Sequence, residues 1–225
     1  METIPYVNIA VQWSREKDEL LPIVERVLAS GKYVGGEEVD KLEAELENLF
    51  NVEHVVAVNS GTDALMFGLN AVGVGPGDEV ITPPNSFIAS TAAIAHLGAK
   101  PVFVDVCADQ NIDPNLIERS ITKNTKAIMP VHLTGRMANM KAITEVSNKF
   151  NIPIVEDAAQ AVGSRYENQP SGTWGIVGCF STHPLKNLNS CGDGGFITTN
   201  DGNIADSIRS LRNHGLVGRD TGSKF

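Results

Sequence analysis

The chain has 225 residues, of which 42% are hydrophobic and 20% charged, which is enough for one large or two small domains with a buried core. Its formal net charge of −9, without a basic run, argues against a nucleic-acid partner. The three cysteines include no CxxC pair and the N-terminal residues hold no long apolar run, so we expect a cytoplasmic protein with reduced thiols, no membrane span and no metal site.

Two amphipathic helices are predicted near the N-terminus. After irregular residues 1–13, apolar residues recur at helical spacing from Ser14, the expected N-cap, to a stop at Gly31. A second helix is expected over residues 37–50. We interpret both as packing helices of an N-terminal helical segment, residues 1–50, that packs on the rest of the chain.

A strand–turn–helix unit follows, with a turn that is rich in hydrogen-bond donors. The run HVVAVN at 54–59 predicts a buried strand, and an apolar helix is expected over 64–72. The turn between them, Ser60 to Asp63, offers the free amides of a helix start and the hydroxyl of Thr62, which together can bind a phosphate. Plain capping of the helix by Ser60 or Thr62 explains the same residues, and the turn alone leaves both interpretations open.

Strand and helix then alternate along the chain, joined by short loops. Further strands are expected at 79–82, 100–105, 126–131, 152–155, 176–180 and 195–199, and further helices at 85–97, around 117–121, at 140–150 and at 204–212. This alternation predicts an α/β fold, a three-layer α/β/α sandwich whose mostly parallel mixed sheet is covered by helices on both faces. We expect one domain over residues 1–225.

The strand at 152–155 ends on two carboxylates, Glu156 and Asp157, and the following strand leads into a polar loop with one lysine, Lys186. Such an acid and such a lysine can meet above the edge of an open α/β sheet, where ligands bind. Enzymes that use pyridoxal 5′-phosphate (PLP) need this pair, because the amine bonds to the aldehyde and the acid partners the ring nitrogen. Alone, the acids also suit a helix N-cap or surface turn, and the lysine suits a solvated loop.

Eight short motifs occur together in the chain. They are SGTDAL at 60–65, GVGPGDEVITP at 73–83, KPVFVDV at 100–106, PVHLTG at 130–135, EDAAQAVG at 156–163, CFSTHPLKNL at 179–188, GDGG at 192–195 and LRNHG at 211–215. In this order and spacing the set resembles the DegT/DnrJ/StrS family of sugar aminotransferases, which are fold-type-I PLP enzymes of the aspartate aminotransferase superfamily. The resemblance covers nearly the whole chain and implies the large, PLP-binding domain of that fold.

The resemblance implies a role for three residues around the PLP ring. Lys186, in the SxxxxK pattern that starts at Ser181, matches the lysine that forms the covalent aldimine with PLP and shuttles protons. Asp157 matches the partner of the pyridinium nitrogen, and these two are the expected catalytic residues. Gln160 resembles the residue beside the 3′-oxygen of the cofactor.

It implies four further cofactor-binding residues. Gly61 and Thr62 match the family's phosphate cradle, and Ser181 matches a third phosphate ligand. Phe87 sits where the family stacks an aromatic ring on the cofactor, although an isolated aromatic residue more often packs in a core.

The implied reaction moves an amino group from an amino-acid donor, usually glutamate, to a keto-sugar that is typically nucleotide-linked, in amino-sugar and polysaccharide biosynthesis. The family works as homodimers. Gly35, His132 and Arg136 could face the sugar, but structural or solvent-facing roles fit them better, and His183 suits either role.

The chain departs from the family's pattern in its length. Family members continue past the LRNHG helix into a smaller C-terminal domain, which this sequence lacks, so we expect a large domain or a truncated chain. Two alternatives are therefore kept: a PLP-binding, non-catalytic homologue with a regulatory or remnant role, and a sugar dehydratase that uses the amine form of PLP. Lys186 argues against the dehydratase, because those relatives carry histidine at that position.

Overall fold

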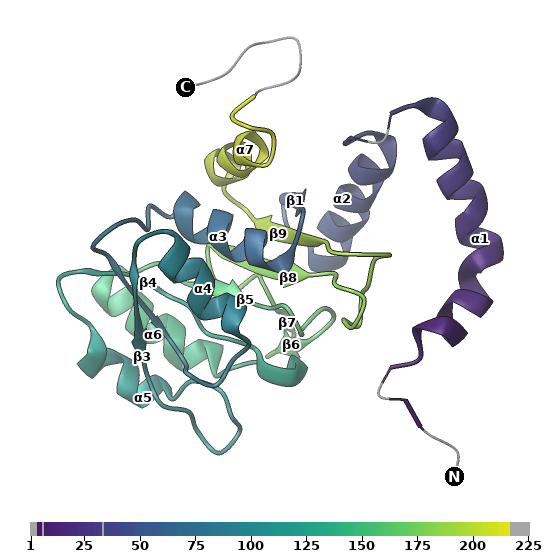
Figure 1. The fold of residues 1–225 in the computed structure, drawn as a ribbon. Coiled ribbons are helices and arrows are strands. Elements are labelled where there is room, and N and C mark those ends of the chain that lie inside the picture. The colour runs from purple at the N-terminus through teal and green to yellow at the C-terminus, as the bar shows by residue number, and fades with distance from the viewer. Residues whose placement is uncertain (1–3, 6, 33, 217–225) are drawn as a thin grey trace. The chain divides into compact units, whose positions relative to one another are not determined.

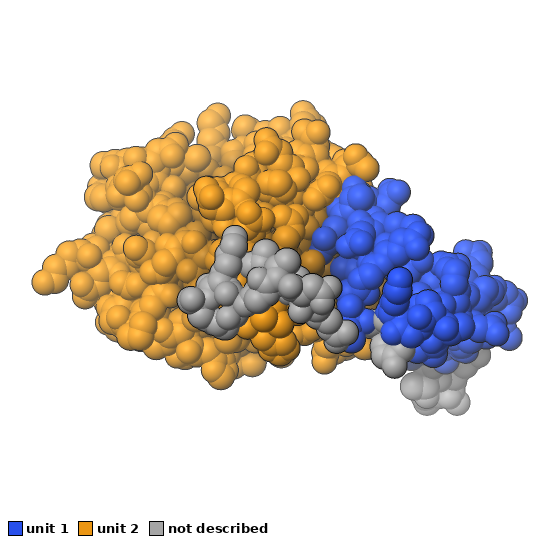
Figure 2. All heavy atoms as spheres, turned by 90° about the horizontal axis from the view of Figure 1, so that it is seen from above, with its two compact units in different colours: residues 1–45 blue, residues 46–225 orange. Residues whose placement is uncertain are grey.

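The computed structural model describes residues 4–5, 7–32 and 34–216. It divides into two compact units, residues 1–45 and 46–225, which Figure 2 colours separately. The prediction of one domain with an N-terminal helical segment over residues 1–50 stays a prediction. Residue 33, between the two predicted N-terminal helices, lies outside the described residues.

The first unit contains helix α1 (Ile9–Ser30) and the first part of α2 (Glu37–Phe50). The expected N-cap at Ser14 is wrong, because the side chain of Asn8 accepts a hydrogen bond from the backbone N–H of Val11 and begins the helix earlier. The hydroxyl of Ser14 instead donates to the carbonyl of Val11 inside the helix. Gly31 ends the helix as predicted, in a left-handed conformation with φ of 66°.

The second unit is built on seven strands in two hydrogen-bonded groups. The orders are β1-β9-β8-β5 and β3-β2-β4, with β1 at His54–Val58, β2 at Glu79–Thr82, β3 at Lys100–Phe103, β4 at Thr125–Ile128, β5 at Val155–Asp157, β8 at Val177–Ser181 and β9 at Gly195–Thr199. Isolated parallel bridges, Ile128 with Ile154 and Val131 with Asp157, connect the two groups beside β4 and β5. Among these seven strands only β9 runs antiparallel to its neighbours, so the mostly parallel mixed sheet is confirmed.

Helices follow the strands, as the alternation predicts (Figure 1). They are α3 (Gly61–Ala71), α4 (Ile88–His96), α5 (Pro114–Ile117), α6 (Met140–Phe150) and α7 (Gly202–Leu211), with 3₁₀ turns at Glu118–Ser120 and Leu133–Gly135. A short hairpin of β6 (Arg165–Tyr166) and β7 (Gln169–Pro170) lies between β5 and β8, where no strand was predicted. None of the described helices is long and apolar enough to cross a membrane.

The apolar core lies on both faces of the sheet. Consecutive strand side chains point to opposite faces, so Val80 and Ile81 of β2 belong to different core clusters. Helices α3, α4 and α7 contribute to the cluster of Val80, and α5 and α6 to that of Ile81. This arrangement confirms the α/β/α layers.

A third cluster is dominated by phenylalanine rings. Phe196 of β9 is fully buried, and its ring stacks on that of Phe180 in β8 with centroids 4.5 Å apart. Phe50, at the end of α2, lies 5.7 Å from Phe196 between ring centroids. These packed rings fix β8 against β9 next to Ser181, the last residue of β8.

We predict that Phe196→Ala destabilises the fold by about 3–5 kcal/mol, because it removes a buried ring and leaves a cavity between packed strands. Urea unfolding would measure the change. The matched control is Phe103→Ala, at a residue whose side chain is 52% exposed, which should change stability by less than about 0.5 kcal/mol. Equal effects of the two variants would contradict the role given to the phenylalanine cluster.

Candidate active site

The predicted site residues come from the ends of β1, β5 and β8 and from the loops that follow them. β5 and β8 are parallel neighbours, and β1 runs parallel to β8 across the antiparallel β9. Their carboxyl ends therefore lie at one edge of the sheet, where open α/β folds bind ligands.

Asp157 is the last residue of β5, and only 4% of it is exposed. Its Oδ2 accepts a hydrogen bond of 2.7 Å from the hydroxyl of Ser90, and its Oδ1 accepts one of 3.2 Å from the backbone N–H of Ala159. Burial raises the pKa of this carboxyl, against the lowering effects of those two hydrogen bonds and of the charge of Lys186. Asp157 is thus a buried acid for which a nearby cation would be favourable.

Lys186 lies in the loop after β8 and is half-buried. Burial lowers the pKa of its ammonium, and the negative charge of Asp157 opposes that shift. In the described part of the chain no ion pair joins the two side chains, although each charge shifts the pKa of the other group. The structure thus brings the predicted amine and acid close together without pairing them directly, and a lowered pKa increases the share of nucleophilic, neutral amine.

The turn after β1 begins helix α3 at Gly61, three residues earlier than expected. The hydroxyl of Ser60 accepts a hydrogen bond of 3.0 Å from the backbone N–H of Asp63, so Ser60 is the helix cap. Within the described residues, the hydroxyl of Thr62 and the first two amides of the helix have no hydrogen-bond partner. Capping therefore accounts for Ser60, and it leaves Thr62 and two amide donors for a ligand.

Ser181, at the end of β8, lies against this turn. A Cβ added to Gly61 would lie 2.6 Å from the Cβ and 3.0 Å from the Oγ of Ser181, so only glycine allows this approach. Gly195 at the start of β9 is equally constrained, since its added Cβ would lie 2.7 Å from the carbonyl of Ser60. The three predicted phosphate ligands, Gly61, Thr62 and Ser181, are thus brought together.

Within the described residues, the side chains of Phe87 and Gln160 make no hydrogen bond to the other predicted site residues. Phe87 is 76% exposed at the start of α4, which contradicts core packing and leaves the ring free to cover a ligand. Gln160 is exposed. Its backbone carbonyl oxygen lies 3.0 Å from the position that a Cβ on Gly135 would occupy.

Unlike Asp157, Glu156 has a carboxylate whose two oxygens are both occupied by hydrogen bonds from the protein itself. Its buried carboxylate accepts hydrogen bonds from the backbone N–H groups of Gly172, Trp174 and Gly175, at 2.8, 2.7 and 2.6 Å. It also accepts one of 2.8 Å from Nε2 of His132, whose Nδ1 accepts from the backbone N–H of Ala138. His132 is fully buried, as a structural role requires, and Glu156 holds the loop that leads into β8.

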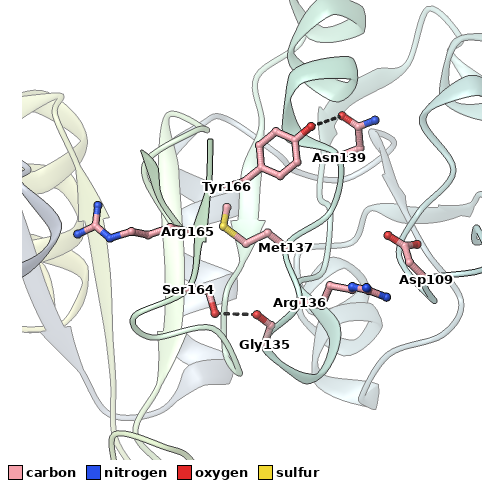
Figure 3. A pocket seen from close by; sticks show the side chains of 8 residues that line it. All are labelled: Asp109, Gly135, Arg136, Met137, Asn139, Ser164, Arg165 and Tyr166. Carbon is pink, nitrogen blue, oxygen red and sulfur yellow. Dashed lines mark hydrogen bonds between the residues drawn. The ribbon is translucent and has the colours of Figure 1, made fainter. Parts of the chain in front are cut away.

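A pocket of about 530 Å³ lies beside the site, between the loop at 135–139 and the β6–β7 hairpin. Figure 3 shows its lining residues, Asp109, Gly135, Arg136, Met137, Asn139, Ser164, Arg165 and Tyr166. The Tyr166 hydroxyl donates to Asn139 Oδ1 at 3.0 Å, and the Ser164 hydroxyl donates to the Gly135 carbonyl at 2.6 Å. Arg136 belongs to this pocket; the predicted cofactor residues do not line it.

Ser90 is the residue that sequence reasoning missed. The stretch from Asn85 was interpreted only as a helix opening with Phe87, and a serine inside a helix carries no signal of its own. Its position one turn after Phe87 was the only available indication.

Comparison with known proteins gives a consistent result. A model of the DegT/DnrJ/EryC1/StrS aminotransferase family matches residues 14–225. A "pleiotropic regulatory protein" of Geobacillus stearothermophilus is 41% identical over 213 residues, which are 94% of this chain and 57% of that protein. A UDP-2-acetamido-2-deoxy-3-oxo-D-glucuronate aminotransferase of Pseudomonas aeruginosa is 43% identical over 94% of this chain and 59% of its own.

Among solved structures, ntda from Bacillus subtilis with bound cofactor PMP superposes with a TM-score of 0.93 at 32% identity. That likeness covers all of this chain and 51% of the other. The chain thus spans less than two thirds of the length of the curated relatives it matches.

We predict that Asp157→Asn lowers the pKa of Lys186 further, because the aspartate charge is what opposes the effect of burial. The pH dependence of the reaction of Lys186 with an amine-labelling reagent, followed by peptide mass spectrometry, would measure this. Asp193→Asn, an exposed acid of the same loop that is no cause of the Lys186 shift, is the control and should leave the profile unchanged. A profile unaffected by Asp157→Asn would mean that the two groups are not coupled.

Proposed function

Because the chain belongs to the DegT/DnrJ/EryC1/StrS aminotransferase family, we propose that Lys186, Asp157 and the turn at 60–62 form the cofactor site of a PLP-dependent sugar aminotransferase. The observation that carries the proposal is the placement of a half-buried amine beside a buried acid at one sheet edge, coupled in charge but not ion-paired. Since the chain spans just over half of its relatives, the activity is proposed for the protein of which it forms this part.

The donor set suits each part of PLP. The free amides and the Thr62 hydroxyl at the start of α3, with Ser181 beside them, suit a phosphate at a helix N-terminus. The buried carboxylate of Asp157 suits a cationic ring nitrogen, and the amine of Lys186 suits an aldehyde. PMP, the cofactor of the B. subtilis relative, is the amine form of PLP.

When bound, the cofactor supplies an aldehyde and an electron-withdrawing ring that stabilises a carbanion. In our proposal the Nζ of Lys186 would hold the cofactor, and the same amine, once free of it, would accept a proton from the substrate carbon and return one. Asp157 would keep the proton on the ring nitrogen, Phe87 would cover the ring, and Gln160 would lie beside the 3′-oxygen. Gly61, Thr62 and Ser181 hold the phosphate.

We propose a nucleotide-linked keto-sugar as the amino acceptor and glutamate as the donor, in amino-sugar and polysaccharide biosynthesis. The name of the P. aeruginosa relative, an aminotransferase of a UDP-linked oxo-sugar, supports this substrate class. The proposal includes a cytoplasmic homodimer, in which a second copy would cover the exposed apolar residues Phe87, Ile88 and Leu185.

A regulatory role is the second candidate, since the G. stearothermophilus relative is named a regulatory protein. A regulatory protein would use the cofactor site only as a structural or sensing element. Lys186 would then not need to transfer protons. The P. aeruginosa relative, which is named an aminotransferase, favours the enzyme.

We predict that the purified chain binds PLP with the visible-edge absorbance of a lysine-bound cofactor, and that glutamate shifts this absorbance to that of the amine form. Lys186→Ala should abolish the lysine-bound band, since no other amine is placed beside Asp157 in the described residues. Lys141→Ala, at an exposed lysine of α6, is the control and should keep the band.

Absence of the band in the wild-type chain, or its retention in Lys186→Ala, would contradict the proposed site. A band that forms but does not respond to glutamate would favour the regulatory candidate over the enzyme.

A further inference from the structure

Two hydroxyls, that of the buried Ser90 and that of the half-buried Ser86, connect α4 and the loop before it to Asp157. Ser90 of α4 is 1% exposed, and its Oγ lies 2.7 Å from Oδ2 of Asp157. The Oγ of Ser86, which is half-buried, lies 2.7 Å from the Oγ of Ser90. A chain of hydrogen bonds therefore runs from Ser86 through Ser90 to Asp157.

The direction of these hydrogen bonds follows from the charge of the acid. An ionised carboxylate can only accept hydrogen bonds, so the hydroxyl of Ser90 donates the hydrogen bond to Asp157. Ser90 then accepts from Ser86, because its own proton is already used. Both bonds point toward the carboxylate, and such chains strengthen one another in a site of low polarity.

The remaining contacts of Asp157 orient it without neutralising it. Within the described residues, its Oδ1 accepts only the Ala159 N–H, and the charge of Lys186 acts on it without an ion pair. His132 makes its short contact with Glu156. In the described residues, Ser90 is thus the one side chain that donates a hydrogen bond directly to Asp157.

Ser90 also connects Asp157 to the loop that carries Phe87. Ser86 directly precedes Phe87, the exposed ring that begins α4, and Asn85 beside it donates to Gln110 at 3.1 Å. The loop that presents Phe87 is therefore held on one side by Gln110 and on the other by the hydroxyl chain to Asp157.

We propose that Ser90 is a positioning residue for the cofactor site: its hydroxyl, supported by Ser86, holds the ionised carboxylate of Asp157 in the orientation that pairs with a cationic ring nitrogen. The inference rests on the proposed function. Without this donor the buried carboxylate would be free to rotate and would be more easily neutralised by a proton.

The test uses two non-covalent probes that cannot bond to Lys186, because both lack an aldehyde. One is 4-deoxypyridoxine 5′-phosphate, and the other is its 1-deaza counterpart, in which carbon replaces the ring nitrogen. Ser90→Ala should weaken binding of the first about tenfold, the size expected for a charge-assisted hydrogen bond, and leave binding of the second unchanged. Isothermal titration calorimetry at neutral pH would measure both.

Two further variants separate this role from a general effect on folding. Thr91→Ala, next to Ser90 on α4 and half-buried, has no side-chain hydrogen bond to lose within the described residues and should change neither affinity. Ser86→Ala should weaken binding of the nitrogen-containing probe in the same direction as Ser90→Ala, but less, because its hydroxyl acts through Ser90. In an Asp157→Ala background, Ser90→Ala should have no additional effect.

The inference is overturned if Ser90→Ala weakens both probes equally, which indicates a structural role, or if it weakens neither. It is also overturned if the effect persists in the Asp157→Ala background. A wild-type chain that binds neither probe would instead contradict the proposed function, and this inference would fall with it.

Discussion

A carboxylate buried at the end of a strand is the constraint on which the candidate site depends. Moving an ionised acid out of water is costly, and the pKa of Asp157 is raised accordingly. The fold offsets part of that cost with one hydroxyl and one amide, and the charge of Lys186 offsets a further part. What remains is an affinity for a cation at this position, which the proposed cofactor would satisfy with its ring nitrogen.

The adjacent acid shows what a purely structural carboxylate looks like. Glu156 accepts four hydrogen bonds and fixes the loop before β8, so it has no capacity left for a ligand. Because the two residues are consecutive in a strand, their side chains leave it on opposite faces. The same strand therefore supports the loop on one face and presents Asp157 on the other, which ties the position of Asp157 to the packing of β8.

Much of this could be predicted from the sequence, for a physical reason. Hydrophobic periodicity and turn residues are local signals, and they gave the α/β alternation, the mostly parallel sheet, the Gly31 helix end and the donor-rich turn at Ser60. The partners of buried polar groups are not local: Ser90 meets Asp157 and His132 meets Glu156 only after the sheet has formed. The start of α1 was misplaced because the Asn8 cap competes with a second plausible cap, Ser14. The role of Lys186 came from the family resemblance, since a loop lysine has no signal of its own.

The central claim is that Asp157 keeps a proton on the ring nitrogen of a bound cofactor, and one measurement addresses it directly. The ¹⁵N chemical shift of PLP labelled at the ring nitrogen, recorded in the wild-type protein and in Asp157→Asn, reports whether that nitrogen carries a proton. Our account predicts a protonated nitrogen at neutral pH in the wild type and an unprotonated one in the variant. An unprotonated nitrogen in the wild type, or the same shift in both proteins, would contradict it.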